Sequence, residues 1–194
     1  MNIKKLSEMM EVRAGHTFRG KAEDGSRIDG YKVIQIKDIR EGGVDLSNLP
    51  FAAVESGKLK NTLHTGDILF PLRGNRIEAV LLTLPDKQPV ITTNQVAILS
   101  MPMDGVNAAY VCWYLNSSEG RSQVSRLKVG SVISSISLKD LSNLPVPQPS
   151  LCIQLKIAKA YKNWISQKKI LESLASNGEE LLGAFCTKLL REDL

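Results

Sequence analysis

The sequence is poor in the residues that bind metals and form disulfides. It contains three cysteines and two histidines among 194 residues, and no two cysteines form a Cys-x-x-Cys pair. Neither histidine lies beside a cysteine, so the sequence disfavours a zinc site, and we expect no metal and no cofactor. Scattered cysteines in odd number indicate free thiols in a reducing compartment, so we expect a cytoplasmic protein.

Long apolar runs and targeting signals are also missing. No stretch reaches the roughly 18 consecutive apolar residues that a membrane-spanning helix needs. The first residues include Lys4 and Lys5 but no apolar core of signal-peptide length. We therefore expect no membrane association.

The common catalytic motifs are absent. There is no P-loop, which an ATP-driven motor needs, and no glycine-rich cofactor turn or Asn/Asp-Pro-Pro-aromatic loop of the kind found in DNA methyltransferases. His16 and His64 adjoin no nucleophile elbow, which disfavours a hydrolytic triad. Residues 85–87, Pro-Asp-Lys, look like a nuclease fragment, but no acidic-x-Lys follows, and a hairpin turn is the better interpretation. We expect no catalytic residues.

Binding features are better represented. The net charge of +5 is compatible with a polyanionic partner without requiring one. Residues 121–139 combine basic side chains with many serines and contain no acidic residue. Cations, hydroxyls and backbone amides are the groups that contact DNA phosphates, although a solvated loop would have the same composition.

Two further loops carry basic residues. Residues 71–76 place two arginines and an asparagine on a glycine turn, and arginine pairs with guanine as asparagine pairs with adenine. Residues 15–30 are also basic, although three acidic residues offset them. The predicted DNA-binding residues are Arg19, Lys21, Arg27, Arg73, Asn75, Arg76, Arg121, Arg126, Lys128, Ser131, Ser134 and Ser135.

The chain divides near residue 148. Residues 1–148 contain short β-rich runs broken by Gly, Asp, Asn and Pro, at 31–36, 67–70, 79–84, 90–93 and 96–99. Short helices are predicted at 107–116, 117–128 and 137–141. The pattern predicts an α+β domain with an irregular mixed or antiparallel sheet. Three alternating prolines within residues 144–149 then hold the chain extended.

Residues 149–194 are predicted to form a long helix or a helical hairpin. Apolar residues recur at alternating spacings of four and three, which is typical of a coiled coil, and such a helix is too long for one small domain to cover. Residues 176–178, Ser-Asn-Gly, could break the helix and let its second half fold back. The predicted dimerisation residues are Ile157, Tyr161, Trp164, Leu171, Leu182, Phe185 and Leu189.

These features, in this order, resemble one half of the specificity subunit of type I restriction-modification enzymes. The Pro-rich segment 144–147 followed by a glutamine-led helix from Gln154 is the most specific part. Other matching segments are 15–18, 33–39, 63–69, 73–74, 94–95, 110–116 and 130–131. Full subunits have two recognition domains and two long helices, whereas this sequence has one of each.

The resemblance implies a function in DNA recognition. Such a domain reads one half of a bipartite DNA target, and its helix pairs with a second helix that sets the spacing between two domains. The pair docks DNA methyltransferase subunits, and a translocating endonuclease subunit can join. We therefore expect a non-catalytic, DNA-binding homodimer, and the alternative is a protein-interaction module or regulator built on the same domain without DNA readout.

Overall fold

The computed structural model describes residues 2–24, 30–40, 42–54, 62–74, 77–85, 89–129 and 134–192. It divides into two compact units, the first ending at Ala158 and the second beginning at Lys159. The predicted boundary at residue 148 coincides with the end of the last strand. The first unit extends beyond it because Gln154 and Ala158 are buried.

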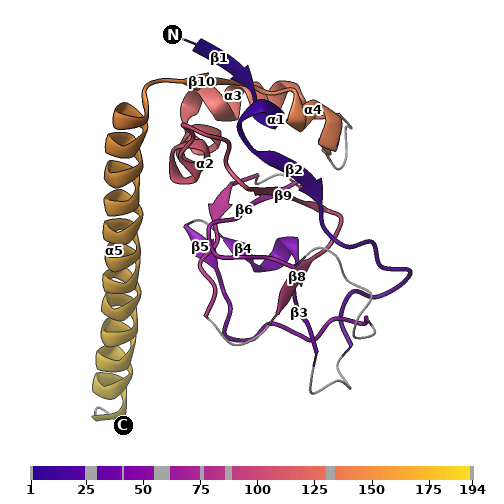
Figure 1. The fold of residues 1–194 in the computed structure, drawn as a ribbon. Helices are drawn as coiled ribbons and strands as arrows, with labels where there is room; N and C mark the ends of the chain where they lie inside the picture. Colours follow the sequence, from indigo (N-terminus) through magenta and orange to yellow (C-terminus); the bar gives the residue numbers. More distant parts are fainter. Residues whose placement is uncertain are drawn as a thin grey trace. The chain divides into compact units, whose positions relative to one another are not determined.

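A four-stranded antiparallel sheet forms the centre of the first unit (Figure 1). Its strands run in the order β2 (Glu11–Ala14), β9 (Val96–Ser100), β6 (Ile68–Pro71) and β7 (Val80–Leu81). Every residue of β6 and β9 is buried, as expected for inner strands covered on both faces. The strand predicted at 79–84 is shorter in the structure, where it is β7. Its ladder with β6 stops at the turn that precedes Ile68.

Besides the central sheet, the described residues form three two-stranded sheets, and two of these lie within residues 32–92. β3 (Lys32–Ile34) pairs in parallel with β8 (Val90–Thr92), and β4 (Ile39–Arg40) pairs with β5 (Gly43–Val44) in a hairpin. The predicted strand at 31–36 ends early because the 3-10 helix η1 (Ile36–Asp38) follows, and the Asp38 carboxylate accepts the Gln35 N–H at the start of this helix. The predicted α+β class with irregular mixed sheets is confirmed.

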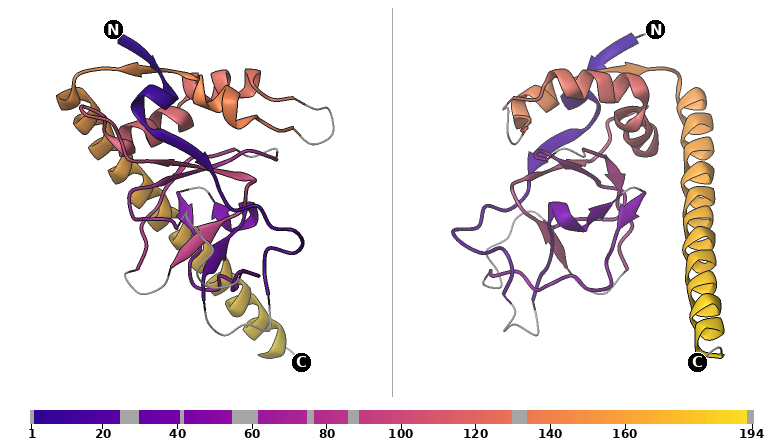
Figure 2. Two further views of the ribbon diagram at one scale, coloured as in Figure 1. Left: turned by 45° about the vertical axis from the view of Figure 1, so that its right-hand side comes forward. Right: turned by 180° about the vertical axis from the view of Figure 1, so that it is seen from behind.

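Four short helices lie at one end of the first unit, as both views in Figure 2 show. Polar side chains begin three of them: the side chains of Asn107, Ser117 and Ser137 each accept a backbone N–H from the first turn. The predicted helices are therefore confirmed to within two residues. The four short helices are α1 (Leu6–Met9), α2 (Ala108–Asn116), α3 (Ser118–Arg126) and α4 (Leu138–Ser142).

The Pro-rich segment is extended, as predicted. As β10 (Pro145–Gln148) it pairs antiparallel with β1 (Asn2–Lys5) in a two-stranded sheet. A proline that cannot donate to a ladder is tolerated in such a short pair, since each strand has a free edge. The tyrosines of α2 contact this segment, and Tyr110 donates its hydroxyl hydrogen to the Pro147 carbonyl at 2.7 Å.

The long helix α5 runs unbroken from Leu151 to Glu192. Its 42 residues correspond to a length of about 60 Å. The helical hairpin, one of the two predicted alternatives, is therefore wrong. Gly178 lies inside the helix, and a Cβ built on it would have no atom within 4 Å besides the adjacent backbone of the helix. A single glycine inside a helix destabilises the helix by only about 1 kcal/mol relative to alanine, which is too little to break it here.

Candidate nucleic-acid interface

Two loops meet where the central sheet ends. The ladder between β6 and β9 closes at Pro71 and Val96. Beyond it, the backbone N–H of Leu72 donates to the Gln95 carbonyl at 2.8 Å. The chain that leaves β6 toward Arg73 therefore lies beside the turn that leads into β9.

The structure brings together two of the predicted DNA-binding segments. The segment after α3 turns back on itself, and Val129 and Ser135 exchange two backbone hydrogen bonds of 2.9 Å. Ser135 also forms a β-bridge with Arg73. The Gly74 N–H donates to the Ser134 carbonyl at 3.1 Å, and the Ser134 hydroxyl donates back to the Gly74 carbonyl at 3.2 Å. The arginine turn and the serine-rich run thus form one surface.

Glycine is required in the middle of this surface. Gly74 has a φ of +106°, a region that other residues rarely adopt, and its hydrogen bonds to Ser134 depend on that conformation. Arg73 is exposed, whereas Ser134 and Ser135 are half-buried. We call Arg73, Gly74, Ser134 and Ser135 the arginine–serine surface.

Helix α3 supplies further basic residues. It leads directly into the segment that pairs with Arg73, and Arg126 is exposed in its last turn. Lys128 is half-buried. The turn before α3 is tight, because a Cβ on Gly120 would overlap the carbonyl of Tyr114.

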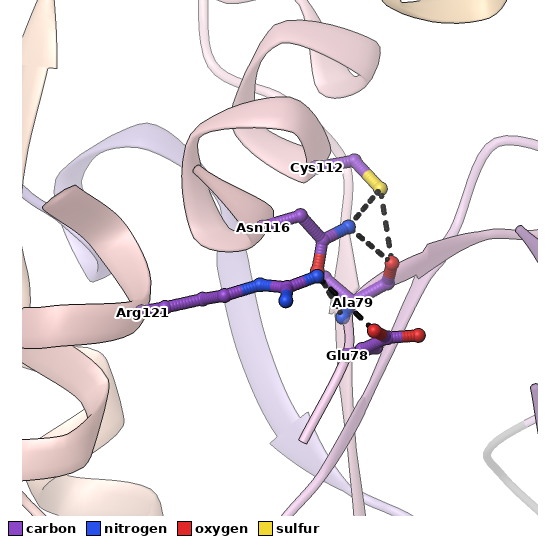
Figure 3. A network of polar contacts seen from close by, with 5 residues as sticks. All are labelled: Glu78, Ala79, Cys112, Asn116 and Arg121. Carbon is purple, nitrogen blue, oxygen red and sulfur yellow. Dashed lines mark hydrogen bonds and ion pairs between the residues drawn. The ribbon is translucent and has the colours of Figure 1, made fainter. Parts of the chain in front are cut away.

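Arg121 is engaged with another part of the chain (Figure 3). Its guanidinium forms a 3.1 Å ion pair with Glu78, just before β7. Next to this pair, Asn116 accepts the Ala79 N–H at 2.9 Å and donates to the Ala79 carbonyl at 2.7 Å. The network fastens α2 and α3 to the sheet, so Arg121 has a structural contact as well as a predicted role in DNA binding.

Cys112 belongs to the same network. Its thiol donates to the Ala79 carbonyl at 3.4 Å and is buried, and burial raises the pKa of Cys112 to about 12. A thiol with such a pKa stays protonated at neutral pH and is a poor nucleophile. Cys152 and Cys186 are exposed.

The remaining predicted residues do not join the arginine–serine surface. Arg19 and Lys21 are exposed in the loop after β2, on either side of Gly20. Four predicted residues lie outside the described part of the chain: Arg27, Asn75, Arg76 and Ser131.

A pocket of about 380 Å³ lies beside the turn before β9, and the sequence analysis did not predict it. Apolar side chains, amides and one ion-paired lysine line it. The signal in the sequence was the polar pair Asn94–Gln95 between two apolar β-runs. The lining residues are Phe18, Gly20, Ala22, Gln35, Ile36, Lys37, Thr93, Asn94 and Gln95.

In the described residues, the second unit consists only of the part of helix α5 from Lys159 onward, so no other described element of this unit covers the apolar residues of that part. The predicted seam is exposed from Trp164 onward, and Trp164 and Leu182 have exposed fractions of 54% and 63%. Ile157 and Tyr161 are half-buried. A second apolar stripe, on the flank of the seam, consists of Ile170, Leu174 and Leu181.

The described residues give no sign of a metal site or a membrane span. No three His, Cys, Asp or Glu side chains among them gather in a way that could hold a metal ion. Within the same residues, no helix has the length and apolar character needed to cross a bilayer.

Comparison with solved structures identifies chains of the same fold. A chain solved in work on complex assembly and conformational transition of the type I R-M system is similar over 92% of this chain, with a TM-score of 0.64 and 19% identity. The HsdS subunit from Thermoanaerobacter tengcongensis matches 86% of this chain, with a TM-score of 0.60 and 19% identity. The type I restriction-modification S subunit from M. genitalium matches 90%, with a TM-score of 0.57 and 17% identity.

This chain spans 41%, 37% and 41% of the length of those three chains, respectively. No curated protein matches its sequence. The model of one family, described as the type I restriction modification DNA specificity domain, matches residues 1–176. The match covers the first unit and more than half of α5, and the chain therefore belongs to the type I restriction-modification DNA specificity domain family.

Proposed function

We propose that this chain is the DNA-reading, non-catalytic component of a restriction-modification complex, and that its arginine–serine surface contacts double-stranded DNA. The joining of Arg73 to the serine-rich segment carries the proposal. Cations, hydroxyls and backbone groups held together are the usual contacts to DNA phosphates. In this proposal Arg73 contacts base edges, where arginine pairs with guanine, and Arg126 contacts the DNA backbone.

We further propose that α5 pairs with a second copy of itself. Its exposed seam supports this, because burying Trp164, Leu171, Leu182 and Phe185 removes large apolar side chains from water, at about 1.5–3 kcal/mol each before entropy costs. An antiparallel pair of helices, which the resemblance to specificity subunits implies, would put the two recognition domains at opposite ends of the pair. A twofold assembly of this kind reads an inverted repeat with a central gap, which is a bipartite target.

The exposed stripe of Ile170, Leu174 and Leu181 favours the binding of additional helical partners. A two-stranded coiled coil buries only its a and d seam, so this flanking stripe would stay exposed in the dimer. Methyltransferase subunits are the partners we propose for it, with an endonuclease subunit joining the same complex. The chain would then direct these subunits to its DNA target.

The test is selection of duplexes from a randomised pool by the full-length chain, together with the subunits that co-purify with it from its host. We expect an enriched bipartite sequence and an affinity that falls steeply with salt, because phosphate contacts release counterions. Arg73→Ala should relax the preference at one base pair, with a loss of about 1–3 kcal/mol. Binding that is insensitive to salt and shows no sequence preference would instead favour a protein-interaction module.

A further inference from the structure

The pocket beside the turn before β9 is held open by the backbone around it. The segment after β2 runs along the end of β8: the His16 N–H donates to the Thr92 carbonyl at 2.7 Å, and the Asn94 N–H donates to the His16 carbonyl at 2.8 Å. This approach needs a glycine, because a Cβ on Gly15 would overlap the carbonyls of Thr92 and Thr93. Phe18 thereby lines the same pocket as Asn94 and Gln95.

The one charged residue among the described residues that line the pocket, Lys37, is paired with an acidic residue. Lys37 forms a 3.2 Å ion pair with Glu23, and the Gln35 amide donates to the same carboxylate at 3.0 Å. The hydrogen bond from Lys37 is the main reason that the pKa of Glu23 lies below its usual value, so the Glu23 carboxylate is ionised at neutral pH. A neutral group with hydrogen-bonding edges fits the amides and apolar side chains of the lining.

Asn94 and Gln95 present their amides on a fixed backbone. The Asn94 N–H is bonded to His16, and the Gln95 carbonyl accepts the Leu72 N–H. Both side chains are exposed, and neither amide bonds to any other residue in the described ranges. An unused amide on a rigid turn is suited to a ligand that offers a donor and an acceptor side by side.

We propose that Asn94 and Gln95 read an A·T base pair of the target in the major groove. Amide side chains bond bidentately to N6 and N7 of adenine, and the thymine methyl group is recognised by apolar side chains. Phe18, Ala22 and Ile36 supply the apolar part of the same pocket. The inference rests on the proposed DNA-binding function, because the bond between Leu72 and Gln95 puts the pocket rim next to Arg73.

The experiment compares the full-length wild type with Asn94→Ala and Gln95→Ala in the same duplex selection, and with Asn163→Ala, an exposed amide on α5, as the matched control. The wild type should require A·T at one position that either variant no longer requires. Replacing that adenine with 7-deazaadenine, or that thymine with uracil, should weaken wild-type binding, roughly tenfold for the lost N7 contact. The 7-deazaadenine effect should disappear in Asn94→Ala. Thermal melting shows whether the variants are folded.

Two results would overturn the inference while leaving the proposed function intact. One is an unchanged requirement for A·T in both folded variants. The other is an equal loss of affinity on every sequence, which would mean that the amides contact the DNA backbone. If the wild type shows no sequence preference and Arg73→Ala changes nothing, the proposed function fails, and the inference fails with it.

Discussion

The side-chain carbonyl of Gln154 accepts the backbone N–H of Asn107 at 2.9 Å, which joins the first turn of α5 to the N-cap of α2. The Gln154 amide nitrogen donates to the carbonyls of Gly105 and Pro149, both at 2.9 Å. The side chain is fully buried, and both amide hydrogens and the amide oxygen are used. This glutamine therefore fixes where the long helix starts on the first unit.

Gln154→Ala should destabilise the protein. It leaves the Asn107 N–H and two carbonyls without their partner, and buried unsatisfied groups cost about 1–3 kcal/mol each. Urea unfolding followed by circular dichroism measures the loss. Gln167→Ala changes an exposed glutamine on the same helix and should leave the midpoint nearly unchanged. Equal midpoints for the two variants would contradict this account of Gln154.

Gly15→Ala should separate the loop after β2 from the sheet end. The new Cβ would overlap backbone oxygens, which cannot move aside as a flexible side chain can. We expect a loss of about 1–3 kcal/mol in unfolding free energy, typical of overpacking. Gly20→Ala is the matched control, because no heavy atom lies within 4 Å of its added Cβ. A loss as large for Gly20→Ala would show that the effect does not come from this overlap.

Cys112 predicts a stability change at alkaline pH. Burial raises its pKa from 9.0 to about 12, so the folded chain holds this proton more tightly than the unfolded chain. Its contribution is complete below about pH 9 and declines as the pH rises toward 12. Denaturant unfolding from pH 8 upward should therefore show a steeper loss for the wild type than for Cys112→Ala. Equal slopes of unfolding free energy against pH for the two proteins would contradict a raised Cys112 pKa.

The sequence indicates the local structure well and the contacts between distant segments poorly. Asn107, Ser117 and Ser137 are N-caps whose effect reaches only three residues along the chain, so the helices they begin were predictable. The bridge between Arg73 and Ser135 spans more than sixty residues, and no local pattern encodes it. The pocket was missed for the same reason, because its walls come from three separate segments.

Arg126 and Arg121 should differ in their effect on DNA binding. Arg126 is exposed, so Arg126→Ala should weaken binding to all sequences equally and lower the salt slope by about 1. Arg121 is paired with Glu78, and Arg121→Ala should change the slope less while also destabilising the fold. Binding titrations over a range of salt concentrations measure both slopes. A larger change for Arg121 would show that its ion pair opens on DNA.

Charges placed on the seam of α5 should prevent self-association. In the proposed dimer Leu171 and Leu182 are buried against a second copy, and a buried unpaired carboxylate is strongly unfavourable. Sedimentation equilibrium at tens of micromolar should find a dimer for the wild type and a monomer for Leu171→Asp or Leu182→Asp. Ser166→Asp is the control: this exposed residue lies on the opposite face of the helix, where an added charge meets only water. A wild-type monomer unaffected by either leucine substitution would exclude self-pairing, and a dimer that survives both substitutions would place the interface away from this seam.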